Sequence, residues 1–200
     1  MRRLGILLSG RGSNFAAIAR NIGAGRLDAE IAIVISNKPD AAGLATAREL
    51  GLKAICLPSK GLEREAYDRL VIAELRAAQV DLVCLAGFMR LLSAAFVREF
   101  PLRILNIHPS LLPAFPGLDA QHQAFEYGAR ISGCTVHFVD EKLDHGPIVL
   151  QEAVPVENGD TSDMLAARIL AAEHRVYTEA IRIVLAGRYR IEGRRVILLT

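Results

Sequence analysis

The sequence has few cysteines, and they follow none of the spacings that stabilise small secreted domains or bind zinc. Cys56, Cys84 and Cys134 are odd in number and far apart along the 200 residues, so neither a disulfide framework nor a paired zinc site is expected. We expect buried structural thiols, because free cysteine in an apolar run behaves as a small hydrophobic residue. This pattern indicates a reducing compartment, and no metal is expected.

Long apolar runs and strong charge of one sign are also lacking. No segment approaches the ~20 apolar residues that span a bilayer, and the apolar stretch after Met1 is too short for a signal peptide. The formal net charge is only +2, so bulk electrostatics give no reason to expect nucleic-acid binding. We therefore expect a cytoplasmic protein that binds neither membrane nor nucleic acid.

The composition that is present is that of a globular protein, with 52% apolar and 23% charged residues. A chain of this length fits one domain of roughly 100–250 residues. No linker, repeat or low-complexity stretch divides it, so a single domain over residues 1–200 is expected. The sequence does not determine whether the protein forms a homodimer.

The first half alternates apolar runs with helical patterns. Such alternation with short links predicts an α/β fold with a Rossmann-like, mostly parallel twisted sheet and flanking helices. Asp40 and Ser93 are expected to cap two of the helices. The expected strands are 4–8, 31–35, 53–57, 81–86 and 103–107, and the expected helices are 15–22, 41–50, 63–78 and a short one after residue 93.

The pattern changes after residue 107. A proline-containing loop is expected over residues 108–118, and a terminal hairpin is expected over 189–197. The other elements expected in this half are helices 120–127 and 161–185 and strands 134–139 and 148–154.

A glycine-rich loop follows the first strand. Gly10, Gly12, Ser13 and Asn14 have the form of an anion site, in which backbone N–H groups at a helix start point at a phosphate. A plain turn with a Ser or Asn cap is the alternative. A dinucleotide is disfavoured because Phe15 takes the place of the third glycine and no acidic residue ends the second strand. The loop therefore favours a phosphorylated substrate.

Asn106 and His108 lie two residues apart at the end of a predicted strand, so both side chains are expected on one face. An amide donor beside an imidazole suits acyl transfer, because the amide can stabilise an oxyanion and the imidazole can move a proton. A structural hydrogen bond is the alternative for each residue. A nearby carboxylate would stabilise the imidazolium, and the spacing leaves Asp140, Glu141 and Asp144 open.

Four segments together carry a resemblance that covers essentially the whole chain. It resembles the folate-dependent formyltransferases, and among them the phosphoribosylglycinamide formyltransferase family of purine synthesis. The segments are Ser9-Gly10-Arg11-Gly12-Ser13-Asn14, Leu85-Ala86-Gly87-Phe88-Met89-Arg90-Leu91-Leu92, Leu105-Asn106-Ile107-His108-Pro109-Ser110-Leu111-Leu112-Pro113 and Leu143-Asp144-His145-Gly146-Pro147-Ile148.

The resemblance implies the formyltransferase fold and two small-molecule substrates, 10-formyltetrahydrofolate and 5-phosphoribosylglycinamide, with direct attack by the amine. It implies that Asn106 and His108 stabilise the oxyanion and that Asp144 assists proton transfer. The implied residues for the phosphorylated substrate are Gly12, Ser13, Asn14 and Glu173. The implied residues for the folate are Arg64, Met89, Arg90, Leu91, Leu92, Asn106, Asp140, Glu141, Lys142, Leu143 and Asp144.

The resemblance also leaves rivals and residues without a role. Another folate-dependent formyltransferase or a 10-formyltetrahydrofolate hydrolase is the first rival, although such proteins usually carry an additional domain. A non-catalytic nucleotide-binding module is the second, and the Asn106, His108 and Asp144 set argues against it. No role is assigned to His122, His137 or His145. If one of them has a role, we expect it to be His137, from its place beside the site.

Overall fold

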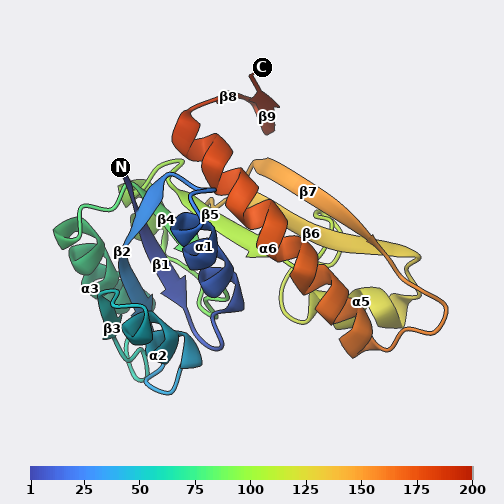
Figure 1. Cartoon of the computed structure of the whole chain (residues 1–200), viewed down its shortest axis with the longest axis horizontal. Helices are drawn as coiled ribbons and strands as arrows, with labels where there is room; N and C mark the ends of the chain where they lie inside the picture. Colours follow the sequence, from blue (N-terminus) through green and yellow to red (C-terminus); the bar gives the residue numbers. More distant parts are fainter. Residues whose placement is uncertain (200) are drawn as a thin grey trace. The chain divides into compact units, whose positions relative to one another are not determined.

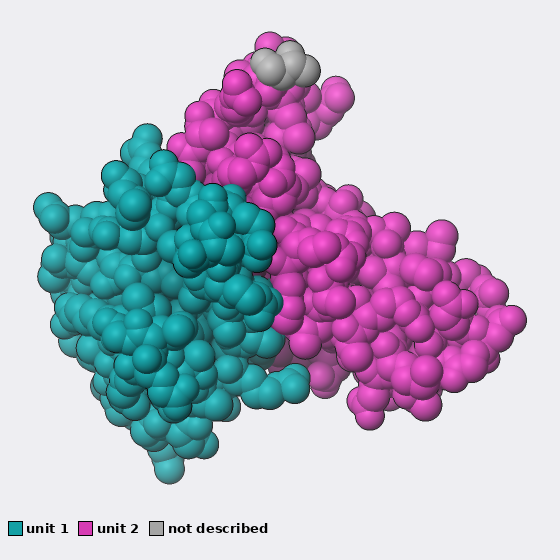
Figure 2. Space-filling view, in the orientation of Figure 1, with its two compact units in different colours: residues 1–105 teal, residues 106–200 magenta. Residues whose placement is uncertain are grey.

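The computed structural model describes residues 1–199, which form two compact units (Figure 2). The first unit covers Met1–Leu105 and the second begins at Asn106. Strand β5, Ile104–His108, contains the boundary, so its first two residues belong to one unit and its last three to the other.

In the first unit the strand order is β3-β2-β1-β4 with parallel pairing between neighbours, and β5 follows β4 in the sheet. The core strands are continuous apolar runs because both faces are covered, as in other parallel sheets. The elements of this unit are β1 Arg2–Leu8, α1 Ser13–Gly23, β2 Ala29–Ser36, α2 Ala42–Glu49, β3 Ala54–Cys56, α3 Arg64–Ala77, β4 Leu82–Leu85 and α4 Ala94–Glu99 (Figure 1).

Of the two predicted helix caps in this unit, the structure confirms Ser93 and not Asp40. Ser93 accepts a hydrogen bond from the Phe96 N–H at 3.2 Å, which confirms the predicted cap of α4. The predicted Asp40 cap is wrong. The capping position of α2 is Ala41, one residue later, and no side chain among residues 1–199 caps that helix.

The second unit contains the strand order β6-β7-β9-β8. Strands β6 and β7 form an antiparallel ribbon, and β9 pairs parallel to β7 at Ile148↔Arg195. Helix α6 packs against β6 and β7, and α5 packs against α6 (Figure 1). The elements are α5 Ala120–Tyr127, β6 Ile131–Phe138, β7 Ile148–Pro155, α6 Ser162–Ala186, β8 Tyr189–Glu192 and β9 Arg195–Leu198.

These elements confirm the predicted fold class, a mostly parallel twisted α/β sheet with flanking helices. The predicted hairpin near the end of the chain is confirmed as β8 and β9, which pair antiparallel around Glu192↔Arg195. Strand β6 begins at Ile131, three residues before the predicted start, because its register with β7 extends to Ile131↔Pro155. The single-domain expectation stays a prediction.

Candidate active site

The second unit holds a buried cluster at the end of β5. His108 is the last residue of that strand and is 4% exposed. Its Nδ1 atom lies 3.4 Å from Oδ2 of Asp144, and both side chains are almost entirely shielded from water. Asp144 is therefore the carboxylate beside His108, among the three that the sequence spacing left open.

The position of Asp144 is set by the loop between β6 and β7. Its Oδ2 atom accepts a hydrogen bond from the Gly117 N–H at 2.8 Å. Its backbone is left-handed, with φ of 46°, a conformation that Asp adopts more readily than most residues. Asp140 binds His145 instead, with 2.7 Å between Oδ2 and Nδ1, and Glu141 is exposed.

His137 completes the cluster, and the sequence assigned it no role. Its Nδ1 lies 2.8 Å from the Phe138 carbonyl oxygen, which can only accept, so Nδ1 carries a proton. Its Nε2 lies 3.2 Å from Nδ2 of Asn106 and 3.8 Å from Oδ1 of Asp144. Burial lowers the pKa of His137 below its usual 6.5, so the ring is neutral and Nε2 accepts from the Asn106 amide.

One signal in the sequence could have revealed His137. Thr135 and His137 are polar residues two apart in strand β6, where seven of the eight residues are buried. Period-2 geometry places both on one face of the strand, and buried polar side chains almost always have partners. Two buried polar side chains on one face of an apolar strand therefore indicate a polar site there.

The His108 ring faces a hydrogen-bond acceptor at each nitrogen. Its Nε2 lies 2.9 Å from the Phe115 carbonyl oxygen, and its Nδ1 faces the Asp144 carboxylate. Because a carbonyl oxygen only accepts, Nε2 must donate to Phe115. Only the imidazolium carries a proton at both nitrogens, so this surrounding suits a histidine that holds and releases a proton at Nδ1.

Thr135 anchors the loop that follows β5. Its hydroxyl donates to the Ser110 carbonyl at 2.7 Å and accepts from the Leu112 N–H at 3.0 Å. Gln151 on β7 donates to the Leu112 carbonyl at 2.9 Å. Strands β6 and β7 therefore hold the backbone that supplies the Phe115 carbonyl to His108.

The glycine loop lies in the first unit, and helix α1 begins at Ser13 with Gly12 at the capping position. Gly12 has φ of 72°, where glycine avoids the steric cost of a side chain. Among residues 1–199 no side chain caps this helix, so the alternative of a Ser or Asn cap is wrong. The first-turn N–H groups lack a capping side chain, and no acidic residue lies in that turn.

Ser9 connects this loop to the segment that the resemblance assigns to folate. Its hydroxyl donates to Oδ1 of Asn37 at 2.6 Å and accepts the Met89 N–H at 2.8 Å. Met89 and Leu91 are 60% and 49% exposed, so they are not core residues. The guanidinium of Arg90 lies over the Tyr67 ring, 4.6 Å from its centroid.

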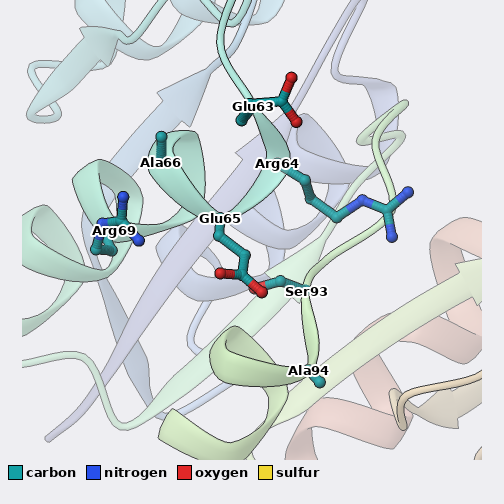
Figure 3. Close-up of a pocket in the computed structure, with 7 residues that line it drawn as sticks. All are labelled: Glu63, Arg64, Glu65, Ala66, Arg69, Ser93 and Ala94. Carbon is teal, nitrogen blue, oxygen red and sulfur yellow. The ribbon is translucent and has the colours of Figure 1, made fainter.

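Arg64 is the first residue of α3 and lines an open groove of about 710 Å³ (Figure 3). Figure 3 shows Glu65 directed toward Ser93 and Arg64 directed away from it. The lining of the groove contains two arginines and two glutamates, so its charge is mixed. Its lining residues are Glu63, Arg64, Glu65, Ala66, Arg69, Ser93 and Ala94.

Glu173 lies on α6 and is 5% exposed. Burial raises the pKa of the Cys134 thiol to about 12, and the charges of Glu173 and Glu152 add to the shift. Cys134 is therefore a protonated, unreactive neighbour of Glu173, as expected for a structural thiol.

Within residues 1–199, no group of three His, Cys, Asp or Glu side chains is arranged to hold a metal ion. No helix in the same range has the length and apolar character needed to cross a membrane.

Comparison with known proteins gives consistent results. The formyl transferase family model matches residues 2–181. The trifunctional purine biosynthetic protein adenosine-3 of Drosophila melanogaster is 48% identical over 93% of this chain, which spans only 14% of that protein's length. The phosphoribosylglycinamide formyltransferase of Escherichia coli strain K12 is 44% identical over 93% of this chain and 88% of its own.

A solved structure agrees with both relatives. Glycinamide ribonucleotide transformylase 1 from Symbiobacterium toebii superposes with a TM-score of 0.98 at 53% identity, covering 100% of this chain and 95% of that one. The chain belongs to the formyl transferase family.

Proposed function

We propose that this chain transfers the formyl group of 10-formyltetrahydrofolate to the amine of 5-phosphoribosylglycinamide, a step of purine (IMP) synthesis. The observation that carries the proposal is the buried contact of His108 with Asp144, beside the amide of Asn106. The similarity to a bacterial phosphoribosylglycinamide formyltransferase along most of both chains supports the choice of acceptor.

The reaction needs no covalent enzyme intermediate. The amine nitrogen of the glycinamide forms a bond to the formyl carbon, and the carbonyl electrons move to the oxygen. The tetrahedral oxyanion then collapses, the bond from the formyl carbon to N10 of the folate breaks, and the electron pair stays on N10. The amine loses one proton and N10 gains one, so protons balance across the transfer.

Asn106 is proposed to stabilise the oxyanion. One of its two amide hydrogens is directed to Nε2 of His137, which fixes the amide orientation and leaves the second hydrogen for the substrate oxygen. A positioned amide donor of this kind contributes roughly 3–4 kcal/mol to the transition state in acyl transfer. His137 is thus proposed as a positioning residue for Asn106.

His108 and Asp144 are proposed to move the proton. Nε2 of His108 is held by the Phe115 carbonyl, so Nδ1 is the atom that exchanges a proton with the reacting groups. Asp144 stabilises the charged ring from 3.4 Å and gives a shuttling water a second acceptor. The stable position of Asp144 on the Gly117 N–H keeps this geometry ready before substrate binds.

The binding residues follow the same proposal. The backbone around Gly12, Ser13 and Asn14 at the start of α1 would hold the substrate phosphate, because a helix N-terminus attracts anions. Glu173 would bind near the substrate amine. The exposed Met89 and the segment that follows it, with Arg64 and the loop 140–144, would contact the folate. We also propose a cytoplasmic location.

The test is an absorbance assay for loss of the formyl group from 10-formyltetrahydrofolate, with and without 5-phosphoribosylglycinamide. Formyl loss that requires the acceptor, with formylated product recovered, supports the proposal. Formyl loss without the acceptor would assign the chain to the hydrolases instead. No formyl loss with active donor and acceptor would reject both activities.

A further inference from the structure

A side chain from the terminal hairpin reaches the loop that carries Asp144. Arg194 lies in the turn between β8 and β9, beyond the residues 2–181 that the formyl transferase family model matches. We propose that Arg194 is a positioning residue for formyl transfer, which holds His145 and thereby keeps the neighbouring Asp144 carboxylate beside His108. The proposal rests on the proposed function for its kinetic consequence, while its structural consequence stands independently.

Arg194 makes two kinds of contact with His145. Its Nη1 atom lies 2.6 Å from Nε2 and 2.9 Å from Nδ1 of the ring, and its Nη2 atom donates to the His145 backbone carbonyl. The next residue, Arg195, pairs with Ile148 at the start of β7. This pairing joins the turn that carries Arg194 to β7, the strand at which the loop ends.

His145 in turn binds Asp140, which lies near the other end of the loop. Its Nδ1 lies 2.7 Å from Oδ2 of Asp140, a carboxylate that accepts, so Nδ1 carries the proton and Nε2 is free to accept from Arg194. Burial raises the pKa of Asp140, but hydrogen bonds from His145 and the Lys142 N–H offset this and hold it below its usual value. The His145 ring thus lies between the Asp140 carboxylate and the Arg194 guanidinium.

Loss of the contact between Arg194 and His145 is expected to affect Asp144 most. It precedes His145 directly and has a left-handed backbone, a conformation that persists where surrounding contacts impose it. On its other side, Leu143 is 55% exposed and contributes little packing. The loop is closed at its base by the Phe138 N–H bond to the Pro147 carbonyl at 2.9 Å. The side-chain clamp at His145 therefore lies between that base and the reacting carboxylate.

The first experiment compares Arg194→Met with Arg190→Met in steady-state formyl transfer. Arg190 is a matched control, because it lies in the same hairpin and pairs with Glu192 rather than with the loop. Arg194→Met is expected to lower kcat about 10-fold, since small misplacements of catalytic groups cost such factors, with the KM for both substrates within about twofold. Arg190→Met is expected to match the unmodified protein. A rise in KM with kcat unchanged would overturn the proposal.

A double-mutant cycle tests whether Arg194 acts through His145. His145→Ala removes the imidazole ring that contacts Arg194 Nη1 and Asp140, while the backbone carbonyl that accepts from Nη2 remains. The double variant with Arg194→Met is expected to lose less kcat than the product of the two single losses, because both changes remove the contact between the guanidinium and the ring. Arg194→Lys keeps one of the two contacts and is expected to recover part of the kcat. Multiplicative losses in the double variant would contradict the proposal.

A crystal structure of Arg194→Met separates this proposal from the proposed function. The distance from His108 Nδ1 to Asp144 Oδ2, 3.4 Å in the unmodified chain, is expected to lengthen, whereas Arg190→Met is expected to keep it. An unchanged distance in Arg194→Met would overturn the clamp even if formyl transfer is confirmed. A lengthened distance would support it even if the substrate proved to be different.

Discussion

At the scale of single residues, the difference between Asp144 and its neighbours is one of contact. Asp140, Glu141 and Asp144 are three carboxylates within five positions, and charge alone makes them equivalent. The Asp144 side chain contacts His108 and is 7% exposed to solvent. The Asp140 side chain contacts His145 and is 36% exposed. A carboxylate shielded from water interacts more strongly with a nearby ring, because screening is weaker there.

The first prediction concerns these two carboxylates. Asp144→Asn keeps the shape of the side chain but removes the charge beside His108, so kcat is expected to fall about 100-fold or more. Asp140→Asn is expected to lower kcat less than about 10-fold, because Asp140 binds His145 and the Lys142 N–H rather than His108. Formyl-loss assays on both variants make the comparison. Equal effects would show that the wrong carboxylate has been assigned.

The second prediction concerns His137 and pH. Burial keeps the pKa of His137 below the 6.5 expected in the unfolded chain. Below about pH 6.5 the unfolded chain therefore binds a proton that the folded protein does not, so the free energy of unfolding falls as pH falls. The slope from one such group is at most about 1.4 kcal/mol per pH unit.

Urea unfolding between pH 7.5 and 5 measures this slope. His137→Asn is expected to give a flatter profile than the unmodified protein, because the titrating group is gone while every other histidine remains. The same variant is expected to lower kcat, since Asn106 loses the Nε2 acceptor that orients its amide. Identical slopes in both proteins would mean that His137 does not titrate as proposed.

At the scale of elements, the loop between β6 and β7 depends on one glycine. A Cβ atom added at Gly146 would lie 1.8 Å from the Phe138 carbonyl oxygen, so no larger residue fits without moving the backbone. This close approach brings the two ends of the loop together beside Asp144. The loop geometry at the site therefore follows from backbone packing as well as from side-chain contacts.

The third prediction compares two alanine substitutions. Gly146→Ala is expected to destabilise the protein by about 3 kcal/mol or more and to lower kcat, because the overlap forces the loop apart. Gly159→Ala is the control, since a Cβ atom there meets nothing within 4 Å and the change is expected to stay within about 0.5 kcal/mol. Chemical unfolding and kcat are measured for both. Equal stability of the two variants would contradict the packing argument.

The elements themselves were largely predictable. Strands β1 and β4 are apolar throughout their buried parts, and this pattern follows directly from burial on both faces. The cap at Asp40 was not predictable, because α2 starts one residue later and the Gly43 N–H in its first turn donates to the distant Gly10 carbonyl at 3.0 Å. Local propensity placed the elements, and tertiary packing placed their ends.

At the scale of the whole molecule, strand β5 contains the boundary between the two compact units. The expectation of a single domain predicts that both units unfold together. The fourth prediction is therefore one cooperative transition in urea, with coincident curves from far-ultraviolet circular dichroism and from tyrosine fluorescence. Two separate transitions would show that the units are independent domains.

The sequence alone determined the alternating strands and helices, the glycine loop and the position of Asn106 and His108 two residues apart at a strand end. These features depend on periodicity and local chemistry. Family resemblance then singled out Asp144. Only the tertiary structure placed His137 against Asn106 and Arg194 against His145. Those contacts join residues 31 and 49 positions apart, and no local pattern records which distant side chains a folded backbone brings together.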